Sequence, residues 1–296
     1  MPYGVQYAKR GRSGDVTGLT TTPTANIGRL ASHNAATEAP QTVTPPAAPQ
    51  RTTGHLALLP LQLIYGIYAA TAFTALALAS LLPLALLPTL PARRRLIQWV
   101  GRASLTLMGM PVRVRWRGAL PDPCIVVANH CSYLDGIVLA AVLPPRFDFV
   151  IKREMASVPV AAFLLRRIGV QFVTRGNHSG KSSDALRVIR SAARGGSLAF
   201  FPEGTFLHEP GLLRFHIGAF AAAERSGAPV VPLAILGTRH CLAPGQILPR
   251  PGIIRVTALA TLRPEPGHPD GAAALRDAAR AAILAATGER DAAGGA

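Results

Sequence analysis

A long uncharged segment near the start of the chain limits what this sequence can fold into. Residues 55–91 contain no Asp, Glu, Lys or Arg, and residues 61–82 also lack proline. As a helix, residues 61–82 would be about 33 Å long, which is enough to cross the hydrocarbon core of a bilayer. A helix this long and this uniformly apolar is unusual for a soluble core, so the segment predicts a membrane helix. Prolines at positions 83, 88 and 91 predict that the helix ends near residue 82.

Three consecutive arginines, residues 93–95, follow this segment. Positive residues beside a membrane helix favour the cytoplasmic side. Two geometries are open: a single span, or a bent pair of helices inserted from one side. Both place the folded portion that follows the arginines on the cytoplasmic face of the cytoplasmic (inner) membrane.

The chain divides into three parts by composition. Residues 1–54 are rich in Thr, Ala and Pro and lack apolar periodicity, which predicts a disordered tail. Residues 55–91 form the membrane-embedded segment, and residues 92–290 the folded domain. In that domain apolar runs alternate with helical patterns, which indicates an α/β fold with a mixed, largely parallel sheet flanked by helices. We expect strands at 112–116, 125–128, 147–152, 170–173, 197–201 and 253–259, and helices at 96–108, 134–142, 158–168, 182–194, 217–225 and 272–286.

Charge and cysteine content narrow the range of partners. The formal net charge of +16 favours anionic partners. No basic stretch is interleaved with aromatic residues and no nucleic-acid-binding motif occurs, so we expect lipid surfaces or phosphorylated substrates and no nucleic acid. The three cysteines show no metal-binding spacing, so neither a metal site nor a disulfide framework is expected.

Two polar turns follow apolar strand-like runs. The run 125–128 leads into a turn with His130, and Asp135 follows five residues later. Across a strand-to-helix turn, both side chains can point into the same opening at the edge of the sheet. There the carboxylate would orient a histidine base. The plainer alternative is a turn histidine and an early-helix carboxylate favoured by the helix dipole. The second run, 197–201, ends in Pro202-Glu203-Gly204-Thr205.

Together, Asn129-His130-x-x-x-x-Asp135 and Phe201-Pro202-Glu203-Gly204-Thr205 resemble the two signature blocks of the glycerolipid acyltransferases, which acylate lysophosphatidic acid and related lysolipids. Residues 169–175 resemble the block between these signatures, and residues 230–235 resemble the final block. The four blocks occur in the family's order, and the resemblance covers residues 105–262.

This resemblance implies a glycerol-3-phosphate acyltransferase-like fold and transfer of an acyl group from a thioester to a lysolipid hydroxyl. His130 would be the base and Asp135 its orienting carboxylate. The resemblance also assigns residues to the acceptor site, which are Lys152, Arg175, Glu203, Gly204 and Thr205. Acyl-CoA and acyl carrier protein are both possible donors, and no cofactor is expected. For Glu203, an ion pair that holds the turn is an equal alternative.

Two departures from the family pattern concern the acceptor. Thr174 stands where the middle block usually carries Asp, and Phe206 where the third block usually carries Arg. Arg214, in the following loop, is a candidate replacement for the missing cation. The first candidate acceptor is 1-acylglycerol-3-phosphate, and another lysolipid such as a lyso-aminolipid is the alternative. A protein of a different functional class is also possible, namely a membrane-anchored lipid-binding protein with an inactive site. Catalysis by a nucleophilic Cys131 is less favoured than catalysis by a His130 base.

Overall fold

The computed structural model describes residues 54–294 except 175–180, 266 and 268. The described residues all belong to one compact unit, Thr52–Ala296. The tail predicted for residues 1–54 therefore lies outside the described residues, apart from Gly54. The boundaries of the three predicted parts, residues 1–54, 55–91 and 92–290, stay predictions.

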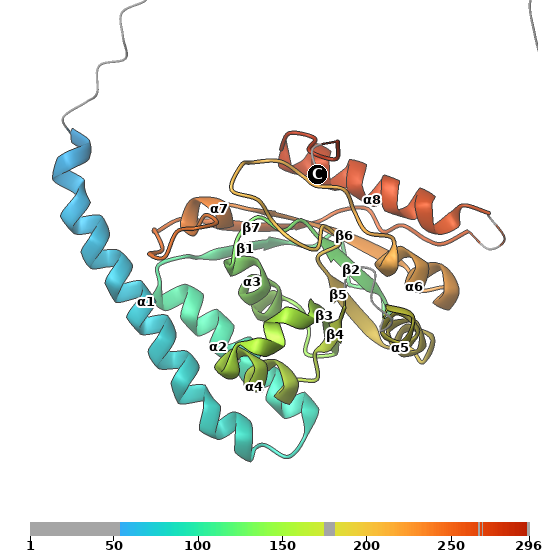
Figure 1. Ribbon diagram of the computed structural model, residues 1–296, viewed down its shortest axis with the longest axis horizontal. Coiled ribbons are helices and arrows are strands. Elements are labelled where there is room, and N and C mark those ends of the chain that lie inside the picture. The colour runs from blue at the N-terminus through green and yellow to red at the C-terminus, as the bar shows by residue number, and fades with distance from the viewer. Residues whose placement is uncertain (1–53, 175–180, 266, 268, 295–296) are drawn as a thin grey trace, which may run out of the picture. The chain divides into compact units, whose positions relative to one another are not determined.

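A seven-stranded sheet forms the centre of the described unit, in the order β1-β7-β6-β2-β5-β3-β4 (Figure 1). All neighbouring strands are parallel except β6 and β7, which are antiparallel. This confirms the predicted mixed, largely parallel sheet. The strands are β1 (Val112–Arg115), β2 (Ile125–Ala128), β3 (Phe147–Lys152), β4 (Gln171–Val173), β5 (Ser197–Phe200), β6 (Val230–Leu236) and β7 (Ile254–Ala258).

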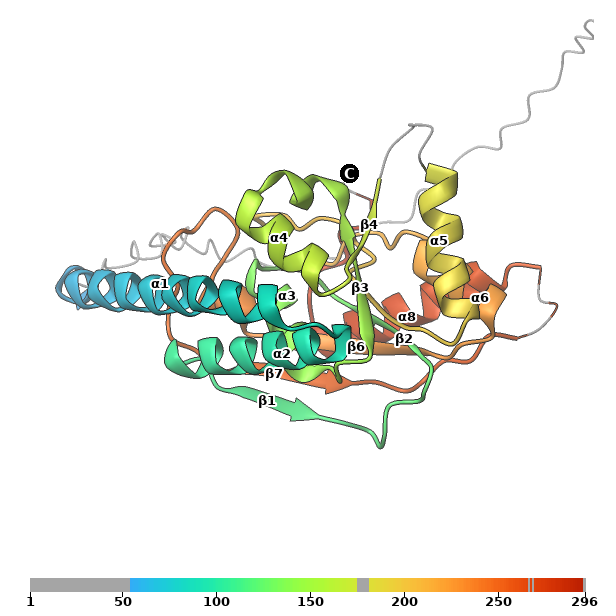
Figure 2. The ribbon, with the colours of Figure 1, turned by 90° about the horizontal axis from the view of Figure 1, so that it is seen from below.

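Helices cover both faces of the sheet (Figures 1 and 2). One face carries α1 (Gly54–Leu86), α2 (Leu90–Leu107), α3 (Leu134–Val142) and α4 (Pro159–Arg167), and the other carries α5 (Lys181–Ala193), α6 (Gly218–Ser226) and α8 (Gly271–Thr287). Two short elements were not expected from the sequence, the 3-10 helix η1 (Arg153–Ser157) and helix α7 (Thr238–Cys241).

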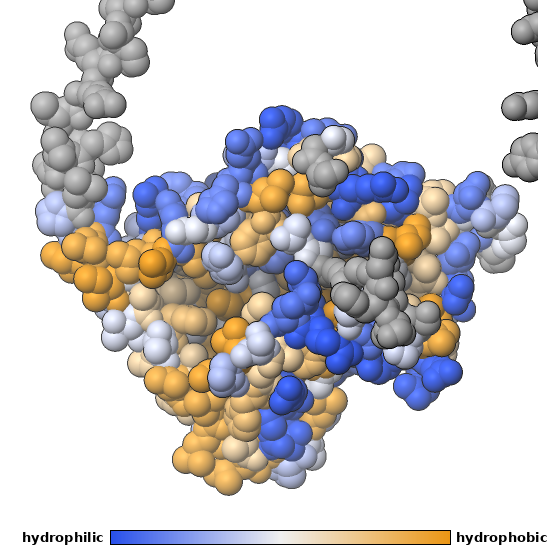
Figure 3. Space-filling model, in the orientation of Figure 1, coloured by the Kyte–Doolittle hydropathy of each residue, from blue (hydrophilic) through white to orange (hydrophobic). Residues whose placement is uncertain are grey.

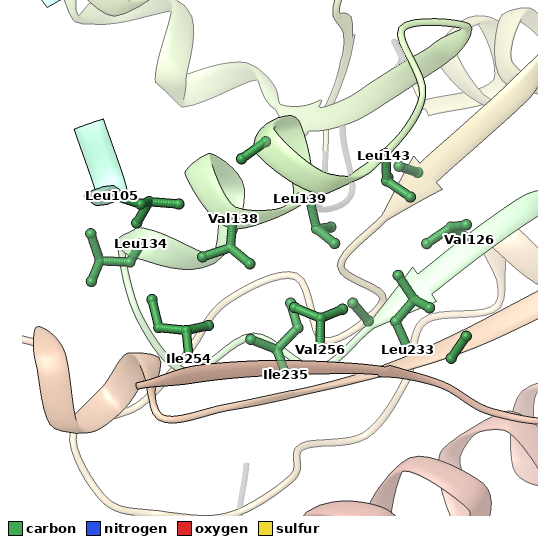
Figure 4. Close-up of a cluster of buried hydrophobic side chains, with 14 of the residues drawn as sticks. Leu105, Val126, Leu134, Val138, Leu139, Leu143, Leu233, Ile235, Ile254 and Val256 are labelled. Atoms are coloured by element: carbon green, nitrogen blue, oxygen red, sulfur yellow. The ribbon is translucent and has the colours of Figure 1, made fainter. Parts of the chain in front are cut away.

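The strand β2 is buried on both faces, as its continuous apolar run predicts. Successive side chains of a strand point to opposite faces, so β2 contributes to two cores. Val126 joins the core beneath α3, where it lies with Val138 and Leu139 (Figure 4). Ile125 and Val127 join the core beneath α6 and α8. These two cores fix β2 at the centre of the molecule.

The end of α1 differs from the prediction. The helix does not end at residue 82 but continues through Pro83 to Leu86. An internal proline removes one backbone hydrogen bond, which apolar membrane helices tolerate more often than soluble ones. After residues 87–89 the chain enters α2, where Pro91 occupies the first turn and so interrupts no hydrogen bond. Helix α2 therefore begins six residues before the predicted 96 and includes the three arginines.

Helix α1 contacts the rest of the domain at Tyr65, about a third of the way along the helix, and again near its end. The Tyr65 hydroxyl donates a hydrogen bond to the carbonyl of Met108. Near its end, the Arg167 guanidinium donates to the carbonyls of Leu84 (3.0 Å) and Ala85 (2.6 Å). The 27 residues Pro60–Leu86 are long and apolar enough to cross a membrane. Figure 3 shows apolar surface gathered over the side of the molecule where α1 and α2 lie.

Candidate active site

The two motif-bearing turns meet at one edge of the sheet. Strands β2 and β5 are parallel neighbours, and Val127 of β2 is in register with Phe200 of β5. Their carboxyl ends therefore open at the same edge, and the turn after β2 lies beside the turn after β5. This is the usual position for a ligand site in an open α/β sheet.

His130 and Asp135 form a hydrogen-bonded pair. The distance from His130 Nδ1 to Asp135 Oδ2 is 2.9 Å. Asp135 is fully buried, and the same oxygen accepts the backbone N–H groups of Cys131 (2.7 Å) and Ser132 (2.8 Å). Because an ionised carboxylate only accepts hydrogen bonds, Nδ1 carries the proton and Nε2 remains an acceptor. The predicted geometry across the turn is present, and it leaves Nε2 available as a base.

Glu203 holds the two turns together from inside the protein. Its side chain is 4% exposed; Oε1 accepts the backbone N–H of His130 (2.6 Å) and Oε2 accepts that of Leu213 (2.8 Å). Burial raises the pKa of Glu203 to about 8, although the two amide hydrogen bonds oppose the rise. The sequence predicted that Glu203 binds the acyl acceptor or, alternatively, forms an ion pair. In the structure both of its carboxylate oxygens instead accept backbone N–H groups.

Aromatic side chains form a wall around His130. The ring of Phe201 stacks on the imidazole at a centroid distance of 4.2 Å, and Phe206 meets it edge-on at 4.5 Å. Tyr133 meets Phe206 edge-on at 4.9 Å. These rings were not predicted to line the site. The positions of Phe201 and Phe206 on either side of the Pro202–Thr205 motif could have indicated it.

The glycine of this motif has a conformational role. Gly204 has φ +77°, a left-handed conformation that side chains other than glycine rarely adopt. Its N–H donates to the carbonyl of Phe201 (3.1 Å), which closes the turn. The next residue, Thr205, is exposed at the same edge. Within the described part of the chain, no acceptor for its N–H is found.

Among the described residues, no hydrogen bond or ion pair joins the predicted cations Lys152 and Arg214 to His130. Lys152 ends β3 at the same sheet edge, but it is exposed and lies 3.6 Å from Glu154. Arg214 is exposed next to Leu213, and its charge contributes weakly to the lowered pKa of Asp277 in α8, which is caused mainly by the Arg276 hydrogen bond. Arg175 lies outside the described residues. The proposed acceptor roles of these three cations stay predictions.

A buried carboxylate organises the backbone just before position 175. Asp184 of α5 accepts the N–H of Thr174 (2.9 Å) and is bridged by Arg153 with 3.1 Å to each oxygen. Arg153 also donates to the Thr174 hydroxyl (2.8 Å), and Arg187 donates to Asp184 (2.8 Å). Thr174, where the family usually has Asp, therefore has a defined structural role here. It ties the end of β4 to α5.

The thiol of Cys131 is poorly suited to nucleophilic chemistry. The residue is buried, and burial, followed by the nearby Asp135 charge, raises its pKa to about 12. Its sulfur lies 3.3 Å from the Thr238 hydroxyl. A thiol with this pKa is not ionised near neutral pH. Among the residues that the structure describes, no cluster of His, Cys, Asp or Glu could hold a metal ion.

An apolar cavity of about 380 Å³ lies next to the aromatic wall. It is enclosed by α1, α2, α3, α4 and β3, and both Tyr133 and Phe201 line it. Cavities that bind ligands usually measure about 300–1,000 Å³ and are mostly apolar. Because Phe201 also stacks on His130, only this ring separates the cavity from the histidine.

Residues 111–236 match the Acyltransferase family. The chain is 35% identical over 147 residues to a lyso-ornithine lipid O-acyltransferase from Pseudomonas aeruginosa, an alignment that covers 49% of this chain and 55% of that protein. It is 30% identical over 186 residues to the 1-acyl-sn-glycerol-3-phosphate acyltransferase alpha of Mus musculus, covering 60% of this chain and 64% of the relative. The matched part of the chain thus spans between half and two thirds of the length of these curated relatives.

The crystal structure of the 1-acyl-sn-glycerophosphate acyltransferase PlsC from Thermotoga maritima has the same fold, with a TM-score of 0.61 at 20% identity. The match covers 76% of this chain and 97% of that one. Fold and sequence therefore define an acyltransferase-type domain. Over residues 111–236 the chain is thus similar to the glycerolipid acyltransferases.

We predict that Glu203 makes the stability of the fold depend on pH. A carboxyl group whose pKa is raised by folding from 4.5 to about 8 stabilises the fold fully below pH 4.5, and this contribution is lost as the pH rises through about 8. Thermal unfolding of the detergent-solubilised protein between pH 5 and pH 9 should show this decline in Tm. Glu203→Gln should make Tm less dependent on pH, because glutamine does not titrate. The substitution can also lower Tm equally at every pH, because the glutamine NH2 group would face one of the two backbone N–H donors.

The matched control is Glu209→Gln, since Glu209 is largely exposed. It should retain the pH dependence of the unchanged protein. Equal slopes for Glu203→Gln and the unchanged protein would show that Glu203 does not titrate in this range.

Proposed function

We propose that this protein is an O-acyltransferase that moves a fatty acyl group from an acyl thioester to the hydroxyl of a lysolipid in membrane phospholipid synthesis. The observation that carries the proposal is the His130–Asp135 pair beside an apolar cavity, with the ring of Phe201 in contact with both. A base beside an apolar cavity suits a reaction between a hydroxyl group and a long acyl chain. The relatives named above support the same class of reaction.

In the proposed reaction, His130 Nε2 removes the proton of the lysolipid hydroxyl as its oxygen attacks the thioester carbonyl. Asp135 holds the proton on Nδ1 and stabilises the imidazolium that forms. This attack forms the C–O bond, and collapse of the tetrahedral intermediate then restores the carbonyl and breaks the C–S bond. The proton passes from the imidazolium to the departing thiolate, so no further reactant is needed.

The negative oxygen of the tetrahedral intermediate needs hydrogen-bond donors. The N–H groups of His130, Cys131 and Ser132 already donate to carboxylates and are not candidates. We assign this role to the N–H of Thr205, which is exposed at the same edge. One such donor is typically worth about 3 kcal/mol of transition-state stabilisation.

The first candidate acceptor is 1-acylglycerol-3-phosphate, in keeping with the relatives that carry this name. A second candidate is a lyso-aminolipid of the lyso-ornithine lipid type, which the Pseudomonas relative acylates by its name. The second candidate is favoured by Phe206, whose ring contacts both His130 and Tyr133. A ring in this position supplies no charge for an acceptor phosphate.

The proposed donor is acyl-CoA or an acylated acyl carrier protein, and the proposed reaction requires no cofactor or metal. We further propose that the protein is held in the cytoplasmic membrane with its catalytic domain facing the cytoplasm. Because α1 contacts the domain both at Tyr65 and at Leu84, we favour one-sided insertion of the α1–α2 hairpin over a single span. A helix crossing the bilayer would leave only one end near the domain.

We predict that His130→Ala lowers acyl transfer by about 10²- to 10⁴-fold, the usual contribution of a general base. Asp135→Asn should lose most of the activity, because the histidine proton is no longer held on Nδ1. The measurement is thiol release from an acyl thioester with and without lysolipid, alongside thermal unfolding to confirm folding. Full activity in folded His130→Ala would contradict the mechanism. Lysolipid binding by the unchanged protein without thiol release would identify a lipid-binding protein with a dead site.

We predict that Phe206→Arg shifts acceptor preference towards 1-acylglycerol-3-phosphate. A charged hydrogen bond to the acceptor phosphate should raise kcat/KM for this acceptor, relative to lyso-ornithine lipid, by about ten- to a hundredfold. The control is Phe206→Leu, which also removes the ring contacts but adds no charge. A similar shift in both variants would show that loss of the ring, rather than the added cation, changes the preference.

We predict that the protein stays in membranes after a high-salt wash, since burial of apolar α1 is not screened by salt. One-sided insertion also predicts that Arg51→Cys, just before α1, reacts with an impermeant thiol reagent only from the cytoplasmic side. The three native cysteines Cys124, Cys131 and Cys241 are buried and give a low background. Labelling from the opposite side would establish a single span, and extraction by salt would show that the basic surface alone holds the protein.

A further inference from the structure

Three arginines share one exposed face of the sheet, at the end away from β4. Arg113 and Arg115 alternate with core-facing valines along β1, and Arg255 lies between two core residues of β7. All three are exposed. We call these three residues the arginine face.

The arginine face concentrates like charge. Arg113 and Arg255 are register partners on adjacent strands, and like charges side by side on a sheet destabilise it. In the described ranges, no carboxylate forms a salt bridge with any of the three. Charged side chains on the edge strand β1 oppose pairing with the edge strand of another molecule, which accounts for Arg113 and Arg115. This does not account for Arg255, because β7 is an interior strand. An external anionic group would neutralise this charge.

The arginine face is directed away from the α1–α2 hairpin. The valines of β1 pack into the core that α2 and α3 cover, so the alternating arginines point to the opposite face, where α8 lies (Figure 1). Figure 3 shows hydrophilic surface on that side and apolar surface on the side of α1 and α2. A bilayer that holds α1 would therefore be on the other side of the sheet, which favours a soluble partner over a lipid surface.

The arginine face is also close to the His130 edge. Leu233 of β6 is in register with Ala128, and Leu236 with Arg255, so Arg255 lies at about the level of His130 along the strands. Two strand spacings separate β7 from β2 and three separate β1 from β2, which gives roughly 10 Å and 14 Å across the sheet. An extended phosphopantetheine arm is longer than either distance.

We propose that the arginine face is the docking surface for an acidic acyl carrier protein, which delivers its acyl thioester to His130 around the edge of the sheet. This inference rests on the proposed acyl transfer and selects one of its two donors. The acidic surface of the carrier supplies the carboxylates that the arginines lack. The carrier approaches from the aqueous side while α1 remains in lipid.

The test compares two triple variants of the full chain in nanodiscs of zwitterionic lipid. The first is Arg113→Gln with Arg115→Gln and Arg255→Gln. The control makes the same charge change at Arg190, Arg194 and Arg225, which are exposed and form no salt bridge within the described structure. Arg190 and Arg225 lie in α5 and α6 on the same face of the sheet, and Arg194 directly follows α5. Binding of a fluorescent, acyl-loaded bacterial acyl carrier protein is measured by anisotropy at low and high salt. Initial rates are measured with acyl carrier protein and with acyl-CoA as donors.

Loss of three exposed ion pairs should weaken carrier binding and raise the carrier KM by about tenfold at low salt. The KM for acyl-CoA and the control variant should be unchanged, and Tm should not fall, because repulsion between the arginines is removed. Unchanged carrier binding would overturn the proposal, as would an equal rise in KM for both donors. Reduced binding to anionic vesicles with unchanged carrier binding would identify a lipid surface and also overturn it. Carrier binding that depends on the arginine face without any acyl transfer would support the docking surface but refute the proposed function.

Discussion

The site depends on one buried carboxylate that joins segments far apart in sequence. Glu203 accepts backbone N–H groups from His130 and from Leu213, and so connects the turn after β2 to the loop that follows β5. A buried carboxylate is costly without such donors, so the two turns and the carboxylate stabilise one another. Asn129 forms a similar link, because its side chain both donates to and accepts from the backbone of Ile235 in β6. His130 is thus positioned by backbone contacts on both sides of its strand.

Much of the fold could be predicted from the sequence because short apolar runs bounded by proline, glycine or polar turns define its central elements. The strands Ile125–Ala128 and Phe147–Lys152 and the helix Leu134–Val142 have the predicted bounds. The order of the strands and the antiparallel direction of β7 could not be predicted, since they depend on non-local pairing. Pro83 was misjudged because the rule that proline ends helices is weaker in an apolar helix.

The candidate site was predicted only in part. The His130–Asp135 pair follows from local geometry across one turn, and the structure contains it. The contacts of Glu203 and the rings of Phe201 and Phe206 arise only when two turns, about seventy residues apart, meet at the sheet edge. Helix α1 shows a similar limit. It was predicted as a membrane helix alone, but Phe73 and Ala77 also line the cavity beside the site. A fragment that begins at residue 92 would lack this wall.

The contacts of Asp184 have a consequence for changes in the connection between β4 and α5. This carboxylate fixes the end of β4 through Thr174 and lies near the start of α5, so both ends of the intervening connection are attached to the scaffold. A change in the length of this connection would therefore leave the sheet and the histidine in place. Removing the Asp184 carboxylate would instead release the end of β4 from α5.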